Sequence, residues 1–196
     1  FEEDRDEYVS ENIFFVPQKS RWDYIAENAH SPEIGIILDD AMREIESENK
    51  SLVGVLPKVY ATPDLDKRVL GEVVDIFTNI NMFAHGNEKD LLGRTYEYCL
   101  EQFAAYEGKN GGEFYTPTSI VKTIVEILKP FNGRVYDPAC GSGGMFVQSE
   151  TFVENHSGNI NNLSIYGQEA NADTWKMAKI NMAIRGIEPN FGPHQA

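Results

Sequence analysis

The stretch YDPACGSGGMF, residues Tyr136 to Phe146, predicts how the second half of this chain folds. A short apolar run leads into an acid and a proline, and three glycines then fall within four positions. This order is typical of a parallel strand that ends in a tight bend and continues into a helix. Because ligands of open parallel sheets bind beyond such strand ends, we expect the bend to line a binding site.

Helical and strand patterns alternate around this bend. We expect a helix over 116–130, with Thr116 as its cap and Pro117 in its first turn. Strands over 133–137 and 162–169 should flank a helix over 143–156, and a last helix should span 171–186. Strands separated by such helices imply parallel pairing with right-handed crossovers. The pattern therefore predicts an α/β fold, the first part of a doubly wound sheet.

The first half of the chain predicts mostly helices, over residues 31–50, 62–80 and 89–107. The segment around Pro17 is expected to form a short strand or hairpin. Apolar side chains at helical spacing should form the buried faces. For the helix over 31–50 these are Ile34, Ile37, Leu38, Ala41 and Ile45; for 62–80, Leu65, Val69, Val73, Ile76, Phe77 and Ile80; and for 89–107, Leu92, Tyr96, Cys99, Leu100 and Phe103. In the second half, the helix over 116–130 should bury Ile120, Val121, Ile124, Val125 and Leu128.

A glycine-rich segment, YEGKNGGEF at 106–114, predicts a flexible link. It suggests two domains, a helical one over 1–110 and an α/β one over 111–196. The chain begins at Phe1 rather than Met, which we interpret as part of a longer protein.

Composition excludes several classes of protein. The chain has 196 residues and a formal net charge of −14, so its average surface would repel DNA. If DNA is a ligand, a local patch or a partner subunit must supply most of the phosphate contacts. Two cysteines form no disulfide framework, which favours the reducing cytoplasm. No apolar run approaches the roughly 20 residues of a membrane span, and no signal peptide is present. The cysteines and histidines show no metal-ligand spacing, so no metal is expected.

Three ligands compete for the glycine bend. A phosphate-binding loop for a nucleoside triphosphate needs a lysine after the glycines, and none follows. A dinucleotide fingerprint needs a third glycine where Phe146 stands, so a nicotinamide cofactor is a weak second candidate. S-adenosylmethionine has no phosphate and carries an ammonium and a sulfonium, which suit an acid at the bend. Asp137 would face its amino acid moiety, and Glu169, at the end of the next strand, would accept hydrogen bonds from its ribose hydroxyls.

Together, the motifs resemble one family. GGEFYTP, DPACGSGG and YGQEAN occur in this order, as in the amino-group DNA methyltransferases. With LLGRTYEYCLEQFA and NIFFVPQKSRW, the chain resembles the modification (M) subunit of type I restriction-modification systems over essentially its whole length. The resemblance implies a Rossmann-like, S-adenosylmethionine-dependent methyltransferase fold behind a helical domain that docks a partner or DNA.

The resemblance also implies site residues and partners. The segment EFYTPT should lie along the methionine end of the cofactor, with the Thr116 hydroxyl at its carboxylate and the Tyr115 ring at its apolar body. The full expected cofactor site is Glu113, Phe114, Tyr115, Thr116, Pro117, Thr118, Asp137, Gly141, Ser142, Gly143, Gly144 and Glu169. The implied partners are a specificity subunit, a second M subunit, a restriction subunit and double-stranded DNA, with no membrane.

One expected motif does not occur. The family transfers methyl to adenine N6 through an Asn/Asp-Pro-Pro-aromatic tetrapeptide that holds a flipped base. No such tetrapeptide is present, and EPNF at 188–191 directly follows a helix and is not a substitute. We therefore expect the parent protein to be an adenine-specific methyltransferase, and this chain to carry half a cofactor site, bind cofactor weakly and methylate nothing. The alternatives are a non-catalytic module that docks a specificity subunit and, less favoured, a nicotinamide-binding domain.

Overall fold

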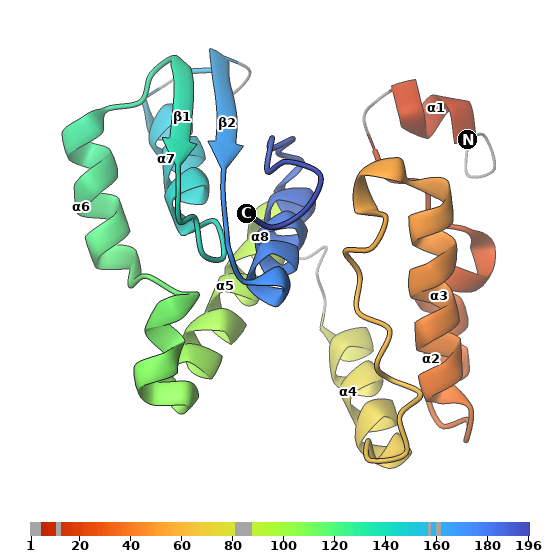
Figure 1. Cartoon of the computed structure of the whole chain (residues 1–196). Helices are drawn as coiled ribbons and strands as arrows, with labels where there is room; N and C mark the ends of the chain where they lie inside the picture. The colour runs from red at the N-terminus through yellow and green to blue at the C-terminus, as the bar shows by residue number, and fades with distance from the viewer. Residues whose placement is uncertain (1–4, 11–12, 81–87, 157, 160–161) are drawn as a thin grey trace. The chain divides into compact units, whose positions relative to one another are not determined.

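The structure is a computed structural model that describes residues 5–10, 13–80, 88–156, 158–159 and 162–196. The chain forms two compact units, residues 1–86 and residues 87–196 (Figure 1). Each unit is described separately below.

Unit 1 is helical. It contains α1 (Arg5–Ser10), η1 (Gln18–Ser20), α2 (Trp22–Glu27), α3 (Ile34–Glu48), η2 (Lys50–Leu52) and α4 (Lys67–Asn79). Its core gathers apolar side chains from α2, the turn that follows α2, α3 and α4: Ile25, Ala29, Ile34, Leu38, Ala41, Leu70 and Val74. The buried face expected for α3 is confirmed, whereas the strand or hairpin expected around Pro17 is wrong in the described residues from 13 onward. There the proline precedes the short turn η1 and leads into α2.

Two buried acids of α3 hold the segment that connects it to α4. The carboxylate of Asp39, which is 3% exposed, accepts hydrogen bonds from the backbone N–H groups of Tyr60 and Ala61. Glu46 accepts from the N–H of Leu56 and pairs with Lys58 at 2.7 Å. Burial raises the pKa of Glu46, but the bonds from Lys58 and the neighbouring backbone outweigh it, so the pKa is lowered overall. Both acids therefore serve the fold of unit 1.

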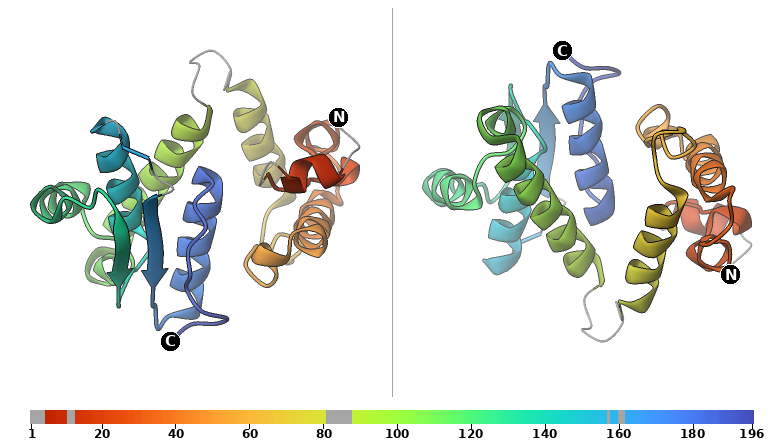
Figure 2. Two further views of the ribbon diagram at one scale, coloured as in Figure 1. Left: turned by 90° about the horizontal axis from the view of Figure 1, so that it is seen from above. Right: turned by 90° about the horizontal axis from the view of Figure 1, so that it is seen from below.

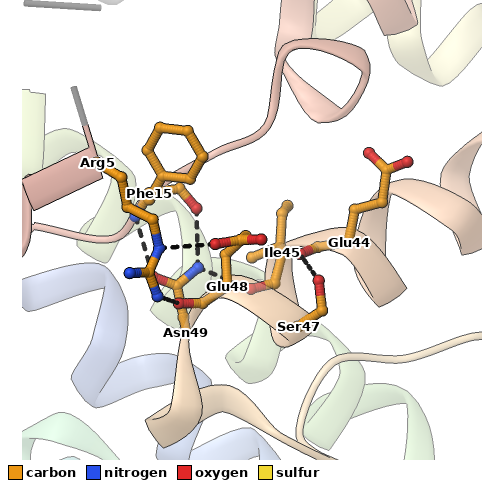
Figure 3. A network of polar contacts seen from close by, with 7 residues as sticks. All are labelled: Arg5, Phe15, Glu44, Ile45, Ser47, Glu48 and Asn49. Carbon is orange, nitrogen blue, oxygen red and sulfur yellow. Dashed lines mark hydrogen bonds and ion pairs between the residues drawn. The ribbon is translucent and has the colours of Figure 1, made fainter. Parts of the chain in front are cut away.

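A polar network joins the start of unit 1 to the end of α3 (Figure 3). The Asn49 side chain donates to the carbonyl of Phe15 and accepts from the N–H of Phe15, at 2.8 and 3.0 Å. Arg5 donates to both the carboxylate and the carbonyl of Glu48. The segment before η1 is thus attached to α3 through side chains, in place of the short strand or hairpin that we expected.

Most of the buried face expected for α4 is exposed on unit 1. Val73 is 42% exposed and Ile76 is 61% exposed, and Val69, Phe77 and Ile80 are exposed as well. Leu70, Gly71 and Val74 point inward instead. A Cβ on Gly71 would lie 2.6 Å from the carbonyl oxygen of Ala29, so the close approach of these backbones sets the rotation of α4. The helix therefore presents a second apolar face.

Unit 2 begins with α5 (Glu88–Glu107), which continues into the turn η4 (Gly108–Glu113). The flexible link expected at 106–114 is wrong, because these residues form the end of α5 and the turn η4. A Cβ on Gly111 would lie 2.1 Å from the Ala104 carbonyl oxygen. The glycine lets the turn fold back tightly onto α5. The boundary between the compact units, at Gly86 and Asn87, also differs from the expected one near residue 110. It does so because α5 packs beside α8 (Ala172–Arg185) of unit 2 (Figure 2).

An arginine fastens α5 to α8. A Cβ on Gly93 of α5 would lie 2.6 Å from the guanidinium of Arg185, so the glycine makes room for this side chain. The same guanidinium lies 3.2 Å from the carboxylate of Glu97, and its side chain is 9% exposed. Leu100 is buried here, but Leu92 and Phe103 of the expected inward face are exposed. Tyr96 bonds to the Met177 carbonyl.

The α/β order expected for unit 2 is confirmed. After η4 come α6 (Thr118–Leu128), β1 (Gly133–Asp137), α7 (Gly144–Asn155), β2 (Leu163–Gly167) and α8. The two strands are parallel, with Gly133 opposite Leu163 and Asp137 opposite Gly167, and they lie side by side in Figure 1. Both strands therefore end at the same edge of the sheet.

Helix α6 packs on α7 along one narrow face. Val121 and Val125 are buried against Phe152 and Val153, as expected. Ile120, Ile124 and Leu128 are exposed, so that part of the predicted buried face is wrong. Pro117 rather than Thr116 occupies the N-cap position of α6, and no side-chain hydrogen bond caps this helix. None of the helices in the described parts of the chain is long and apolar enough to cross a bilayer.

Candidate functional site

The loops that follow β1 and β2 are joined by hydrogen bonds. The N–H of Gln168 donates to the Asp137 carbonyl, and the N–H of Cys140 donates back to the Gln168 carbonyl, both at 2.9 Å. The Tyr136 hydroxyl adds a 2.7 Å bond to the side chain of Gln168. The parallel pairing thus continues past the strands, which places the glycine bend beside Glu169.

The glycine bend requires glycine at two positions. Gly141 has φ of +55° and Gly143 has φ of +87°, a region that side chains strongly disfavour. A Cβ on Gly141 would also lie 2.9 Å from the carbonyl oxygen of Phe114. Gly144 begins α7, whose N-terminus has no side-chain cap. The bend therefore brings bare backbone and the N–H groups of a helix start to the end of β1.

The segment 113–118 lies against this bend. The carbonyl of Phe114 accepts a 2.9 Å hydrogen bond from the N–H of Ser142. The hydroxyl groups of Tyr115 and Thr118 lie 3.2 Å apart, and the side chains of Glu113 and Thr116 are exposed. Two segments about twenty residues apart in sequence, expected on one ligand, are thus in direct contact through their backbones.

Two carboxylates lie close to the bend. Asp137 is partly buried and accepts from the N–H of Ala139 at 3.0 Å. Burial raises the pKa of the Cys140 thiol to about 12, and the charges of Asp137 and Glu169 add to the shift. Cys140 therefore remains a protonated, unreactive thiol near neutral pH. The same two charges make the bend suitable for a cationic ligand.

The Glu169 carboxylate already accepts two backbone hydrogen bonds, which the sequence does not indicate. One carboxylate oxygen accepts from the N–H of Gly141 at 3.0 Å, and the other accepts from the N–H of Asn171 at 2.8 Å. Each oxygen can accept a second hydrogen bond, so the carboxylate can still receive ribose hydroxyls. Asn171 itself caps α8 through bonds from Asp173 and Thr174, so its side chain already has a structural role.

Sequence reasoning missed two contributors to the site, Asn181 and Phe191. Asn181 of α8, which is 1% exposed, donates a 2.9 Å bond to the Ser142 carbonyl. Phe191 is buried and packs on Phe146, and a Cβ on Gly167 would lie 2.8 Å from its ring. For Asn181, the sequence signal was a polar residue at a helical position near Ala178 and Met182, which are both buried.

The EPNF segment is bonded to β2 and α8 of unit 2. Asn190 bonds to the backbone of Ile165 and Gly167 and forms a parallel bridge with Tyr166 of β2. The indole N–H of Trp175 donates to the Phe191 carbonyl. Phe191 is 3% exposed, so its ring is part of the core of unit 2.

The described residues include no group of three or more His, Cys, Asp or Glu side chains that could hold a metal ion. The candidate site is therefore an acidic, glycine-lined bend with contacts from 113–118, Glu169 and α8. Its backbone groups and carboxylates can bind a cationic ligand without phosphate, and nothing in the bend supplies the lysine that a triphosphate needs.

Family models match both parts of the chain. A model described as N-6 DNA Methylase matches residues 87–195, and one described as HsdM N-terminal domain matches residues 2–77. The boundary between these matches coincides with the division into two compact units.

Two curated relatives are substantially similar. The chain is 43% identical over 187 residues to the type I restriction enzyme MjaIX methylase subunit of Methanocaldococcus jannaschii, an alignment covering 95% of the chain and 34% of the relative. It is 48% identical over 170 residues to the HindI methylase subunit of Haemophilus influenzae, covering 82% of the chain and 38% of the relative. The chain thus spans little more than a third of the length of these relatives.

Solved structures share the fold. A type I restriction-modification methyltransferase subunit from Streptococcus thermophilus gives a TM-score of 0.74 at 21% identity, covering 95% of this chain and 42% of that one. A modification subunit of a putative type I restriction enzyme from Vibrio vulnificus gives 0.60 at 24% identity, covering 96% and 46%.

Proposed function

The chain belongs to the N-6 DNA methylase family and carries an HsdM N-terminal domain, and from this we propose that its parent protein is the modification subunit of a type I restriction-modification system. In this proposal the parent transfers a methyl group from S-adenosylmethionine to the N6 amine of adenine in DNA. The chain itself contributes the helical domain and part of the cofactor site.

One observation carries the cofactor proposal, namely the joined strand ends with two carboxylates beside a bare glycine bend. Glu169 bonds to Gly141, and the charges of Glu169 and Asp137 both act on Cys140 within the bend. A ligand with an ammonium and a sulfonium gains from these charges, whereas a phosphate would be repelled. Phe146, buried where a dinucleotide fingerprint has its third glycine, disfavours the nicotinamide alternative.

Each part of the site has a proposed task. Asp137 orients the cofactor amino group, and the Glu169 carboxylate accepts from the ribose hydroxyls while it keeps its two backbone bonds. The bend approaches the cofactor closely because it has no side chains at its glycines. The segment 113–118 binds the methionine end, where Tyr115, Thr116 and Thr118 offer hydroxyl groups. Bound S-adenosylmethionine supplies the electrophilic methyl group, and the chain holds and orients it.

The residues that hold the adenine amine are proposed to lie outside this sequence. No Asn/Asp-Pro-Pro-aromatic tetrapeptide occurs in the chain, and Phe191 of EPNF is buried. The chain alone should therefore hold cofactor weakly and transfer no methyl group.

For unit 1 we propose a docking role toward the specificity subunit. Its α4 face, defined as Val69, Val73, Ile76, Phe77 and Ile80, is exposed and extends to Trp22, whose ring packs on Phe77. Most of the negative charge of the chain lies in residues 1–86, and Glu72 and Asp75 flank the α4 face. An apolar surface beside acids suits a protein partner with basic flanks and disfavours a phosphate backbone. A second M subunit, a restriction subunit and DNA would join through the assembled complex.

A methyl-transfer assay tests the proposed function. The full-length parent protein with its specificity partner should transfer labelled methyl groups to duplex DNA, and digestion should identify the product as N6-methyladenine. Label recovered on cytosine, or no label with a folded complex that binds S-adenosylmethionine, would contradict the proposal. The 196-residue chain under the same conditions should stay at background.

A further inference from the structure

The backbone of Ser142 is held at both ends by different parts of unit 2. Its N–H donates to the Phe114 carbonyl at 2.9 Å, and its carbonyl accepts from the Asn181 side chain at 2.9 Å. Ser142 is 4% exposed and stands between two glycines with positive φ. Because both bonds hold the backbone of Ser142, its position determines where the adjacent Gly141 and Gly143 lie.

Asn181 is an unusual choice for its position. It lies inside α8 near buried Ala178 and Met182, where leucine or methionine would favour the helix more. Its amide nitrogen donates to the Ser142 carbonyl, whereas Oδ1 has no hydrogen-bond partner among the described residues. A buried unpaired oxygen costs free energy, so the stability of the fold alone does not account for an asparagine here.

The orientation of the amide follows from its partner. A carbonyl accepts and cannot donate, so the atom that faces the Ser142 carbonyl must be the amide nitrogen. The bond therefore distinguishes asparagine from leucine, which lacks a donor, and from an ionised aspartate, whose oxygens would repel the carbonyl.

We propose that Asn181 is a positioning residue for S-adenosylmethionine binding, because its amide holds the Ser142 carbonyl and thereby sets the glycine bend in its binding geometry. The inference rests on the proposed function of the bend. Asn181 need not touch the cofactor; it acts through Ser142 on Gly143 and Gly144.

The test measures the affinity of S-adenosylhomocysteine for the full-length parent protein by calorimetry, with thermal unfolding in parallel. Asn181→Leu should weaken binding by roughly three- to tenfold, the worth of about one hydrogen bond, while the protein stays folded. The control, Arg185→Met, lies one turn further along α8, in the contact with Gly93 and away from the bend. It should lower the unfolding temperature and leave the affinity of the folded protein unchanged.

Asn181→Asp supplies a readout that a purely structural role would not move. A buried carboxyl protonates at a higher pH than an exposed one, and the protonated form can again donate to the Ser142 carbonyl. Its binding should be weak at about pH 8.5 and approach wild type at about pH 5.5, while Asn181→Leu stays weak throughout.

Wild-type affinity in folded Asn181→Leu, or an Asn181→Asp variant without this pH dependence, would overturn the inference while leaving the proposed function intact. Failure of the wild-type protein to bind S-adenosylhomocysteine would overturn the proposed function itself.

Discussion

The backbone N–H of Gly141 donates a 3.0 Å hydrogen bond to the carboxylate of Glu169, a residue 28 positions later in the sequence. The same carboxylate accepts from the N–H of Asn171. The acid that is proposed to bind the cofactor ribose therefore also joins the loops after β1 and β2. A substitution of Glu169 is therefore expected to affect both the ribose contact and the joining of the two loops.

Removal of the Glu169 carboxylate should weaken cofactor binding. Glu169→Ala loses the ribose acceptors and frees the Gly141 N–H, so we expect S-adenosylhomocysteine binding to fall by about 1.5–3 kcal/mol, as for hydrogen bonds to a charged group. Calorimetry measures the change. Glu188→Ala removes an exposed acid of the same unit and should leave the affinity unaltered. Equal affinities in the two variants would argue against Glu169 as the ribose ligand.

Two glycines of the bend should respond differently to alanine. At Gly141 a Cβ would lie 2.9 Å from the Phe114 carbonyl oxygen, at a φ of +55°, so Gly141→Ala should destabilise the fold by about 1–3 kcal/mol. At Gly144 the nearest atom is the Val121 Cγ2 at 3.9 Å, so Gly144→Ala should fold normally. Denaturant unfolding measures both free energies. If Gly144→Ala nonetheless binds S-adenosylhomocysteine less tightly, the close approach of this backbone to the ligand is supported; equal stability of the two variants would contradict the contact with Phe114.

Gly93 and Arg185 should be energetically coupled. Alanine usually stabilises a helix interior relative to glycine by about 1 kcal/mol. Gly93→Ala should instead destabilise unit 2, because its Cβ would lie 2.6 Å from a guanidinium that is held beside Glu97. A double-mutant cycle checks this: in an Arg185→Met background the same substitution should become neutral or stabilising. An identical effect in both backgrounds would show that the two residues do not interact.

A charge on the α4 face should weaken the association with the specificity subunit. In the full-length protein, Ile76→Glu places a carboxylate within the exposed apolar stripe, whereas Asn79→Glu places one on the polar side of the same helix. Calorimetry with the purified partner should show a loss of roughly tenfold or more for the first variant and little change for the second. If the variants bind equally well, or if DNA rather than protein binding changes, the docking proposal fails.

The alternation of helices and strands in unit 2 was predictable because apolar periodicity and the terminating glycines agree. Gly186, for example, ends α8 in the left-handed conformation that the sequence indicates. Asp137 ends β1 as expected, whereas β2 ends at Gly167 and Glu169 lies in the loop that follows it. Both carboxylates lie at the same edge because parallel strands end there.

Which apolar side chains are buried was less predictable. Helices α4 and α6 carry apolar residues over a wide arc, and periodicity alone does not tell which part of the arc a neighbour covers. On α4, the close approach of Gly71 to Ala29 turns Leu70 and Val74 toward the core, so these two side chains are buried. Glycines were also ambiguous, because Gly111 packs tightly on Ala104 where the sequence suggests a flexible link. The contacts of Asn181 and of the Phe114 carbonyl with Ser142 are tertiary, and the local sequence pattern does not specify these partners.

The central claim is that the bend at 137–144 and Glu169 bind S-adenosylmethionine, and a titration followed by amide NMR tests it most directly because weak binding is also detected. Addition of S-adenosylhomocysteine to the chain should shift the amide signals of Gly141, Ser142, Gly143, Gly144 and Glu169, while NAD at the same concentrations should leave them in place. Shifts at these residues with NAD alone, or none with S-adenosylhomocysteine at millimolar concentration, would contradict the claim.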